Sequence, residues 1–112
     1  MKEIEVKGEK KPVSFSWNAL EEFHELTGLE VLELLTDVKE ITKPKNLRAL
    51  AYCALKHGNI ESGKNTWDKT IQDVGSWFQY GDKATKDLFA ILQGTYPQGS
   101  DDTSELDEEA KK

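Results

Sequence analysis

Two short segments of alternating apolar and polar residues at the start of the chain predict a β-hairpin over residues 3–16. This alternation has the period of a strand with one buried face. The residues between the segments, 8–11, form the expected turn. Pro12 is expected to open the second strand, where a missing N–H does least harm. The apolar positions of the two strands are Ile4, Val6, Val13 and Phe15.

Beyond the hairpin, apolar residues recur at helical spacing and predict about five helices. The expected fold class is therefore α+β, mostly α-helical, with an N-terminal β-hairpin. The clearest apolar stripe belongs to the helix that begins near Pro44, because proline favours the first helical position. Gly58 is expected to end that helix. The predicted helices span about residues 17–27, 29–37, 44–57, 67–79 and 83–93.

The segment from Trp17 to Leu35 has the densest apolar pattern and the clearest start and stop signals. Asn18 followed three residues later by Glu21 is a capping-box pattern, and Ser16 is a competing N-cap. A glycine after the first helix stops it, because glycine enters the left-handed conformation without penalty. The leucine-rich second helix is apolar enough to need cover from other elements.

Three later positions also predict local structure. Thr66 and Asp82 are the expected N-caps of the last two helices. Gly75 lies inside the first of these helices and costs about 1 kcal/mol relative to alanine, so a close helix contact is expected there. The apolar side chains expected in the core are Phe15, Leu20, Phe23, Leu26, Leu32, Leu50, Leu55, Ile71, Val74 and Leu88.

Composition and charge divide the chain in two. With 112 residues, the chain is long enough for one compact domain, expected over residues 1–97. Residues 98–112 contain six acids and two lysines, a composition typical of a disordered acidic tail. The net charge is −6 and no basic face is obvious in the sequence, so nucleic acid is not an expected partner.

The chain also indicates where the protein works. Cys53 is the only cysteine, so an intramolecular disulfide is excluded and a reducing compartment is favoured. The first residues lack the apolar core of a signal peptide. No apolar run approaches the roughly 20 residues that span a bilayer. A cytoplasmic protein that does not bind a membrane is expected.

Two patterns that could carry chemistry are weak. Residues 58–66 contain the G-x4-G-K spacing of a phosphate-binding loop, but Asn65 stands where a hydroxyl should follow the lysine. The segment also follows a helix rather than a buried strand, so a plain loop is the better interpretation. Cys53 and His57 share a helix face, but a nucleophile needs further groups and zinc needs four ligands. We therefore expect that the protein is not an enzyme and that it binds no cofactor, metal or small-molecule substrate.

The first 60 residues combine a short β segment, an aromatic and acidic motif and a leucine-rich helix. The chain carries Phe15-Ser16-Trp17-Asn18-Ala19-Leu20, then Phe23, then Glu25-Leu26-Thr27-Gly28, then Leu32 and Leu35. This order resembles tail assembly chaperones of long-tailed bacteriophages and prophages, in which a motif like F-x-[FW]-N-A-L-x-x-[FL]-E-E-x-T-G precedes a leucine-rich helix. Residues 47–58, LRALAYCALKHG, are similar to that family's LRALLWAGLxH segment.

The resemblance implies a chaperone that binds the tape measure protein and tail tube subunits in the bacterial host cytoplasm during tail assembly. Such proteins leave before the virion matures. Self-association is expected as well, because a two-stranded hairpin leaves an edge and the chain has more apolar faces than it can bury. The residues expected to bind the partner are Trp17, Phe23, Leu29, Leu32, Leu35 and Trp77.

Two alternatives remain open. A small structural phage tail or connector protein would stay in purified particles, whereas a chaperone would be absent from them. A small transcription regulator would use the helix at 44–57 or at 67–79, but it would need basic residues on one exposed face. The net acidity argues against the regulator.

Overall fold

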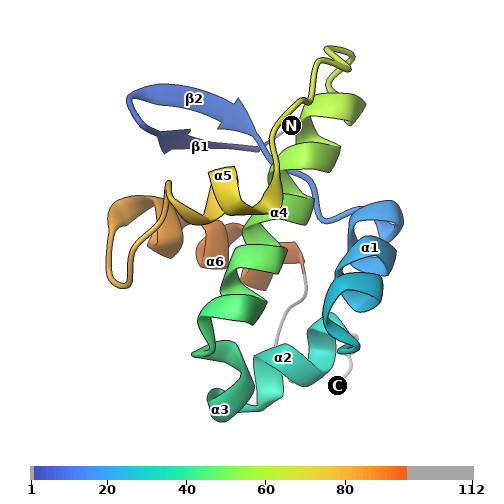
Figure 1. Cartoon of the computed structure of the whole chain (residues 1–112), viewed down its shortest axis with the longest axis vertical. Helices are drawn as coiled ribbons and strands as arrows, with labels where there is room; N and C mark the ends of the chain where they lie inside the picture. Colours follow the sequence, from blue (N-terminus) through green and yellow to red (C-terminus); the bar gives the residue numbers. More distant parts are fainter. Residues whose placement is uncertain (1, 96–112) are drawn as a thin grey trace, which may run out of the picture.

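The computed structural model describes residues 2–95, so the tail expected at 98–112 lies outside the described residues. The described residues form an N-terminal antiparallel hairpin followed by six helices, which confirms the expected fold class (Figure 1). The elements are β1 (Glu3–Val6), β2 (Glu9–Pro12), α1 (Trp17–Thr27), α2 (Val31–Thr36), α3 (Val38–Ile41), α4 (Pro44–Glu61), α5 (Ile71–Gly75) and α6 (Lys83–Thr95).

The hairpin turn is shorter and earlier than predicted. Lys7 and Gly8 form it with φ values of 55° and 79°, the positive values that suit tight two-residue hairpin turns. Val6 then pairs with Glu9, so residues 9–12 form β2, and Pro12 is its last residue rather than its first. The alternation did not reveal β2 because three of its four residues are charged and none of those three is buried.

The residues predicted as the second strand form an extended connection that crosses α4. Val13 and Phe15 are buried on it, as expected. The Ser14 N–H donates to a backbone carbonyl of α4 at 3.0 Å. The hydroxyls of Ser14 and Ser16 donate to the two carboxylate oxygens of Glu61, each at 2.5 Å. The start of the chain is therefore attached to the far end of α4.

Gly58 allows this crossing. The prediction that Gly58 ends its helix was wrong, because α4 continues to Glu61. A Cβ at Gly58 would lie 2.2 Å from the Pro12 carbonyl oxygen and 2.7 Å from the Val13 Cα, distances that no real Cβ tolerates. Close approach of two backbones, not helix termination, requires glycine at this position.

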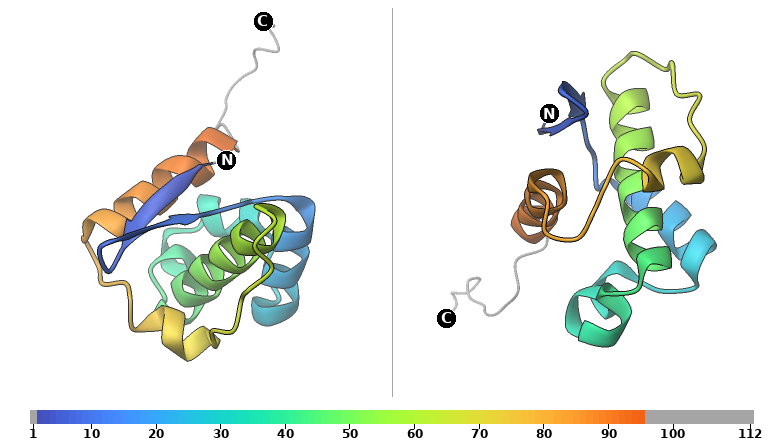
Figure 2. Two further views of the ribbon diagram at one scale, coloured as in Figure 1. Left: turned by 90° about the horizontal axis from the view of Figure 1, so that it is seen from above. Right: turned by 60° about the vertical axis from the view of Figure 1, so that its left-hand side comes forward.

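Helix α4 is the central element, and α1, α3, α5 and β2 all pack against it (Figure 1). Helix α6 packs against β1, and Figure 2 shows it running beside the hairpin. The buried apolar side chains form one cluster. Its α4 members are small or branched: Ala49, Leu50, Ala51, Cys53, Ala54 and Leu55. Leu50, Ala51, Ala54 and Leu55 lie on the stripe predicted for that helix, whereas Ala49 and Cys53 were not part of it.

Of the ten predicted core residues, six are buried, two are half-buried and two are exposed. Leu20 and Ile71 are half-buried against the core. Leu26 and Leu32 are 46% and 61% exposed, so their assignment to the core was wrong. The remaining six are buried: Phe15, Phe23, Leu50, Leu55, Val74 and Leu88.

The helix caps of the N-terminal half differ from the first choice made from sequence. Ser16, not Asn18, caps α1, and its hydroxyl accepts the Ala19 N–H at 3.4 Å. Gly28 ends α1 with φ 77°, as predicted. The predicted helix at 29–37 corresponds to α2, and the short helix α3 that follows it was not predicted.

The predicted helix 67–79 is reduced to α5, which Thr70 caps instead of Thr66. Trp67 explains the difference, because its ring packs edge-on against Tyr52 and Trp77, with centroid distances of 5.9 and 6.5 Å. The aromatic residues at helical spacing therefore form a cluster around an extended segment. The close contact expected at Gly75 is present, since a Cβ there would lie 2.6 Å from a side-chain carbon of α4. Asp82 caps α6 as predicted, accepting a backbone N–H at 2.8 Å.

Candidate partner-binding surfaces

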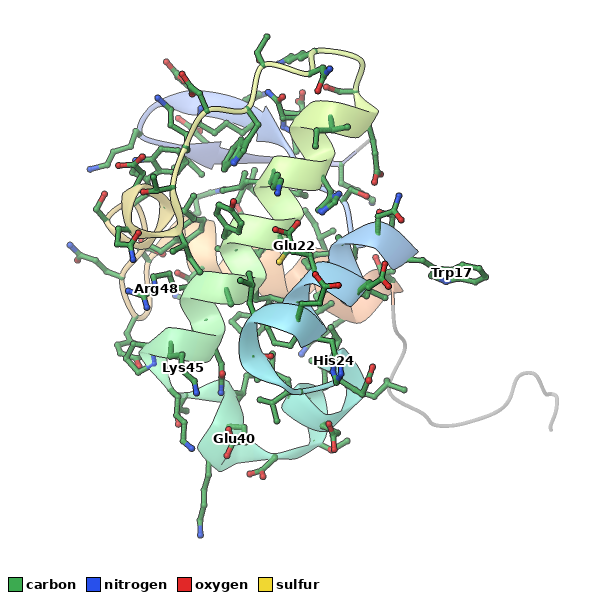
Figure 3. All side chains as sticks on the ribbon, turned by 45° about the vertical axis from the view of Figure 1, so that its right-hand side comes forward. Trp17, Glu22, His24, Glu40, Lys45 and Arg48 are labelled. Atoms are coloured by element: carbon green, nitrogen blue, oxygen red, sulfur yellow. The ribbon has the colours of Figure 1, made fainter. Side chains whose placement is uncertain are left out.

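The residues predicted to bind a partner fall into three environments. Trp17 is 87% exposed at the first position of α1 and projects from the body of the molecule (Figure 3). Leu32 is exposed on α2. Leu29 and Leu35 are half-buried and pack against the edge of the core. These four residues belong to α1, α2 and the short connection between them.

Phe23, although also on α1, and Trp77 have different surroundings. Phe23 is 0% exposed, so its ring is inaccessible to any partner in this structure. Trp77 is half-buried beside Trp67, and the Lys11 ammonium lies 5.3 Å from its ring centroid. The structure therefore does not bring the six predicted residues together. The sequence motif that contains Phe23 serves the packing of α1 on α4.

Helix α2 is apolar on two sides. Val31 and Leu34 are buried in the core. Leu32 and Leu35 lie three residues apart, so they are neighbours on the helix surface, and both are at least partly open to solvent. A helix needs only one apolar side to pack on its own core. The second side of α2 is therefore available for an apolar contact with another molecule.

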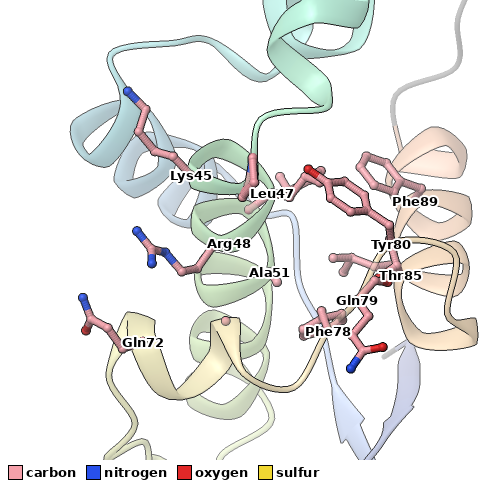
Figure 4. A pocket seen from close by; sticks show the side chains of 14 residues that line it. Lys45, Leu47, Arg48, Ala51, Gln72, Phe78, Gln79, Tyr80, Thr85 and Phe89 are labelled. Carbon is pink, nitrogen blue, oxygen red and sulfur yellow. The ribbon is translucent and has the colours of Figure 1, made fainter.

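A groove of about 450 Å³ lies between α4, α5 and α6, within the usual size range of ligand pockets, about 300–1,000 Å³. Figure 4 shows Leu47 and Ala51 of α4 opposite Tyr80, Thr85 and Phe89. The Tyr80 hydroxyl donates to the Thr42 carbonyl, which fixes the ring on the groove wall. Sequence reasoning missed this groove because the connection between α5 and α6 forms one wall, and periodicity does not place a connection.

Two cations line the groove. Neither Lys45 nor Arg48 forms an ion pair within residues 2–95. Within the described residues the Arg48 Nε is buried without a hydrogen-bond partner, and the arginine stem lies against Gly75. The groove thus combines an apolar wall with available positive charge.

The contact between α1 and α4 contains a partly buried ionic cluster. Glu22 of α1 accepts hydrogen bonds from Lys56 at 3.0 Å and from the His57 Nε2 at 2.7 Å. Burial opposes ionisation of Glu22, but the bonds from Lys56 and His57 outweigh it and lower the pKa of the carboxyl group. Burial also opposes the charge on Lys56, yet the bond to Glu22 raises the pKa of its ammonium group. A helical wheel places Glu22 opposite the apolar stripe of α1, so the sequence alone gives no sign of this cluster.

Cys53 lies beside this cluster but is not an activated nucleophile. Burial, followed by the negative charge of Glu22, raises the pKa of the Cys53 thiol to about 12. The reactive thiolate is therefore almost absent at neutral pH. The His57 Nε2 is bonded to Glu22, so the imidazole holds α1 on α4.

We expect the Glu22→Gln substitution to lower the free energy of unfolding by about 1–3 kcal/mol at pH 7, because charge-assisted hydrogen bonds are lost. A carboxyl group whose pKa is lowered by folding stabilises the fold above its usual pKa of 4.5. This contribution disappears as the pH falls through the lowered pKa. Urea denaturation between pH 7 and 3 should therefore show the two proteins converging in acid. A constant difference would contradict the assignment.

The phosphate-loop pattern of residues 58–66 has the wrong backbone for that role. Gly58–Glu61 belong to α4, so half of the pattern is helical. Asn59 accepts the Thr66 N–H at 2.8 Å and donates to its hydroxyl at 3.1 Å. The threonine hydroxyl therefore has a protein partner. These contacts support the interpretation of the segment as a plain loop.

The remaining observations concern metal binding, membrane-spanning helices and known proteins. Within residues 2–95, no group of three or more His, Cys, Asp or Glu side chains is placed to hold a metal ion. None of the helices in that range combines the length and apolarity needed to cross a membrane. Comparison of the chain with models of known protein families, with curated proteins and with solved structures finds no match in any of the three.

Proposed function

We propose that the protein is a phage or prophage tail assembly chaperone that binds the tape measure protein and tail tube subunits in the cytoplasm of a bacterial host. The sequence motif around Trp17 and the leucine-rich segment after it motivate this assignment. The tape measure protein is a long helical chain with exposed apolar faces, according to the resemblance. A chaperone for such a client needs an apolar surface that its own core does not use.

The single observation that carries the proposal is the second apolar side of α2. Leu32 is 61% exposed, and Leu29 and Leu35 flank it at the edge of the core. An amphipathic client helix places its apolar side chains on an apolar surface of its partner, and these leucines provide such a surface. Scattered exposed leucines are common on protein surfaces, but an apolar row beside the core favours a contact.

The proposal is tested by co-expressing the chain with the tape measure protein of the same phage or prophage. We expect Leu32→Ser to reduce capture by about tenfold or more, since a central apolar anchor is lost. Ile60→Ser is the matched control, because Ile60 is also exposed and apolar but lies near the opposite end of the molecule, at the end of α4. Equal capture by both variants would contradict the assignment of α2.

The content of mature particles provides a second test. A chaperone is absent from purified virions, so mass spectrometry of particles should not find the chain. Its presence in stoichiometric amounts would instead support a small structural tail or connector protein.

A further inference from the structure

Two surfaces on opposite sides of the molecule have complementary shapes and chemistry. Trp17 is almost fully exposed, although an indole ring offers a large apolar area for burial. The groove between α4, α5 and α6 is an apolar hollow of about 450 Å³. Figure 3 shows Trp17 on one side of the molecule and the groove residues Lys45 and Arg48 on the other. Trp17 therefore cannot enter the groove of its own chain.

The charges near the two surfaces are also complementary. Glu21 follows Trp17 by four residues on α1, so the two side chains lie on the same helix face. Glu21 is exposed and forms no ion pair within residues 2–95. The groove provides Lys45 and Arg48, which also lack an ion pair in that range. The apolar indole and adjacent carboxylate of one surface are thus complementary to the apolar groove and adjacent cations of the other.

We propose that Trp17 of one copy of the chain inserts into the α4–α6 groove of a second copy. Tyr80 and Phe89 would pack on the indole ring, and Glu21 would approach Lys45 and Arg48. The second copy is the occupant because the same chain supplies both the exposed anchor and the charges that match the groove. This contact goes beyond the proposed function, since it leaves the Leu32 side of α2 free.

The contact has a definite symmetry. Trp17 and the groove lie on opposite sides of the molecule, so two copies cannot form both contacts reciprocally, and one Trp17 and one groove stay unused after a dimer forms. Head-to-tail contacts of this kind continue until a ring closes or an open array forms. The protein should therefore form species larger than a dimer as its concentration rises.

Sedimentation velocity of the full chain, from low to several hundred micromolar, tests the contact. We expect the wild type to form species larger than a dimer. Trp17→Ser should weaken association roughly thirtyfold or more, because the anchor is lost. Leu26→Ser is the matched control on the same helix, since Leu26 is also exposed and apolar, and it should associate like the wild type. Thermal melts of each variant verify that the fold is intact.

A mixing experiment identifies the two surfaces. Tyr80→Glu places a carboxylate on the groove wall, where it neutralises the cations and repels Glu21, and Tyr80 is exposed enough for the fold to tolerate the change. The Tyr80→Glu chain keeps Trp17, and the Trp17→Ser chain keeps the groove. Each variant alone should be monomeric. An equal mixture should form a heterodimer and nothing larger, because both ends of that heterodimer are blocked.

Several outcomes would overturn the proposal. A wild type that stays monomeric over the whole concentration range would overturn it, as would unchanged association of Trp17→Ser. Loss of association in Leu26→Ser alone would indicate a different surface. A mixture that remains monomeric would show that Trp17 does not enter the groove. The pull-down that tests the Leu32 surface is a separate measurement, so failure of either proposal is recognised independently.

Discussion

Gly58→Ala is expected to lower the free energy of unfolding by about 3 kcal/mol or more. The added Cβ would lie 2.2 Å from the Pro12 carbonyl oxygen, and backbone cannot rotate away as a flexible side chain could. Relief requires the connection after β2 to move off α4. Chemical denaturation followed by circular dichroism measures the loss.

Gly94→Ala is the matched control for this substitution. Gly94 also lies in a helix, α6, but a Cβ there would meet no atom within 4 Å. Alanine should therefore raise the free energy of unfolding by up to about 1 kcal/mol, as helix propensity predicts. A Gly58→Ala protein as stable as the Gly94→Ala protein would show that the connection does not cross α4 at this point.

Phe23→Ala is expected to lower the free energy of unfolding by about 3–5 kcal/mol, the usual loss for a buried aromatic ring. Phe23 is fully buried where α1 packs on α4. Urea denaturation at constant pH measures the effect. Phe23 is also among the residues predicted to bind a partner, and its burial predicts a large contribution to stability.

Leu32→Ala provides the contrast, because Leu32 comes from the same predicted set but is exposed. Its free energy of unfolding should stay within about 0.5 kcal/mol of the wild type. A Phe23→Ala chain that keeps full stability but no longer captures the tape measure protein would restore Phe23 as a partner residue.

The sequence predicted the elements with strong local signals. The stripe of α4 identified Leu50 and Leu55 as core residues, and the positive φ needed after α1 identified Gly28. The Gly75 contact was predictable as well, because a glycine inside a helix needs a packing reason. The stripe and the stop signal can be recognised from a few neighbouring residues, whereas for Gly75 the sequence predicts a contact but not its partner, Arg48.

Features that depend on distant residues were not predictable. Gly58 resembles a helix terminator unless the path of residues 12–13 over α4 is known. Glu22 appears solvated on a helical wheel, and only the fold brings His57 to 2.7 Å from it. The groove is formed by α4, α5 and α6 together, so its aromatic wall at Tyr80 had no local signal. For the same reason the periodicity could not show that Leu32 faces away from the core.

The attachment of the start of the chain to Glu61 also affects the order in which the protein folds. Ser14 and Ser16 bond a residue that lies 47 and 45 positions later in the sequence. Contacts of such long sequence separation form late, after local helices have gained structure. During synthesis the hairpin segment leaves the ribosome before α4 does. It cannot reach its native contacts until the whole of α4 has emerged, so these residues are made before α4 but reach their native positions after it.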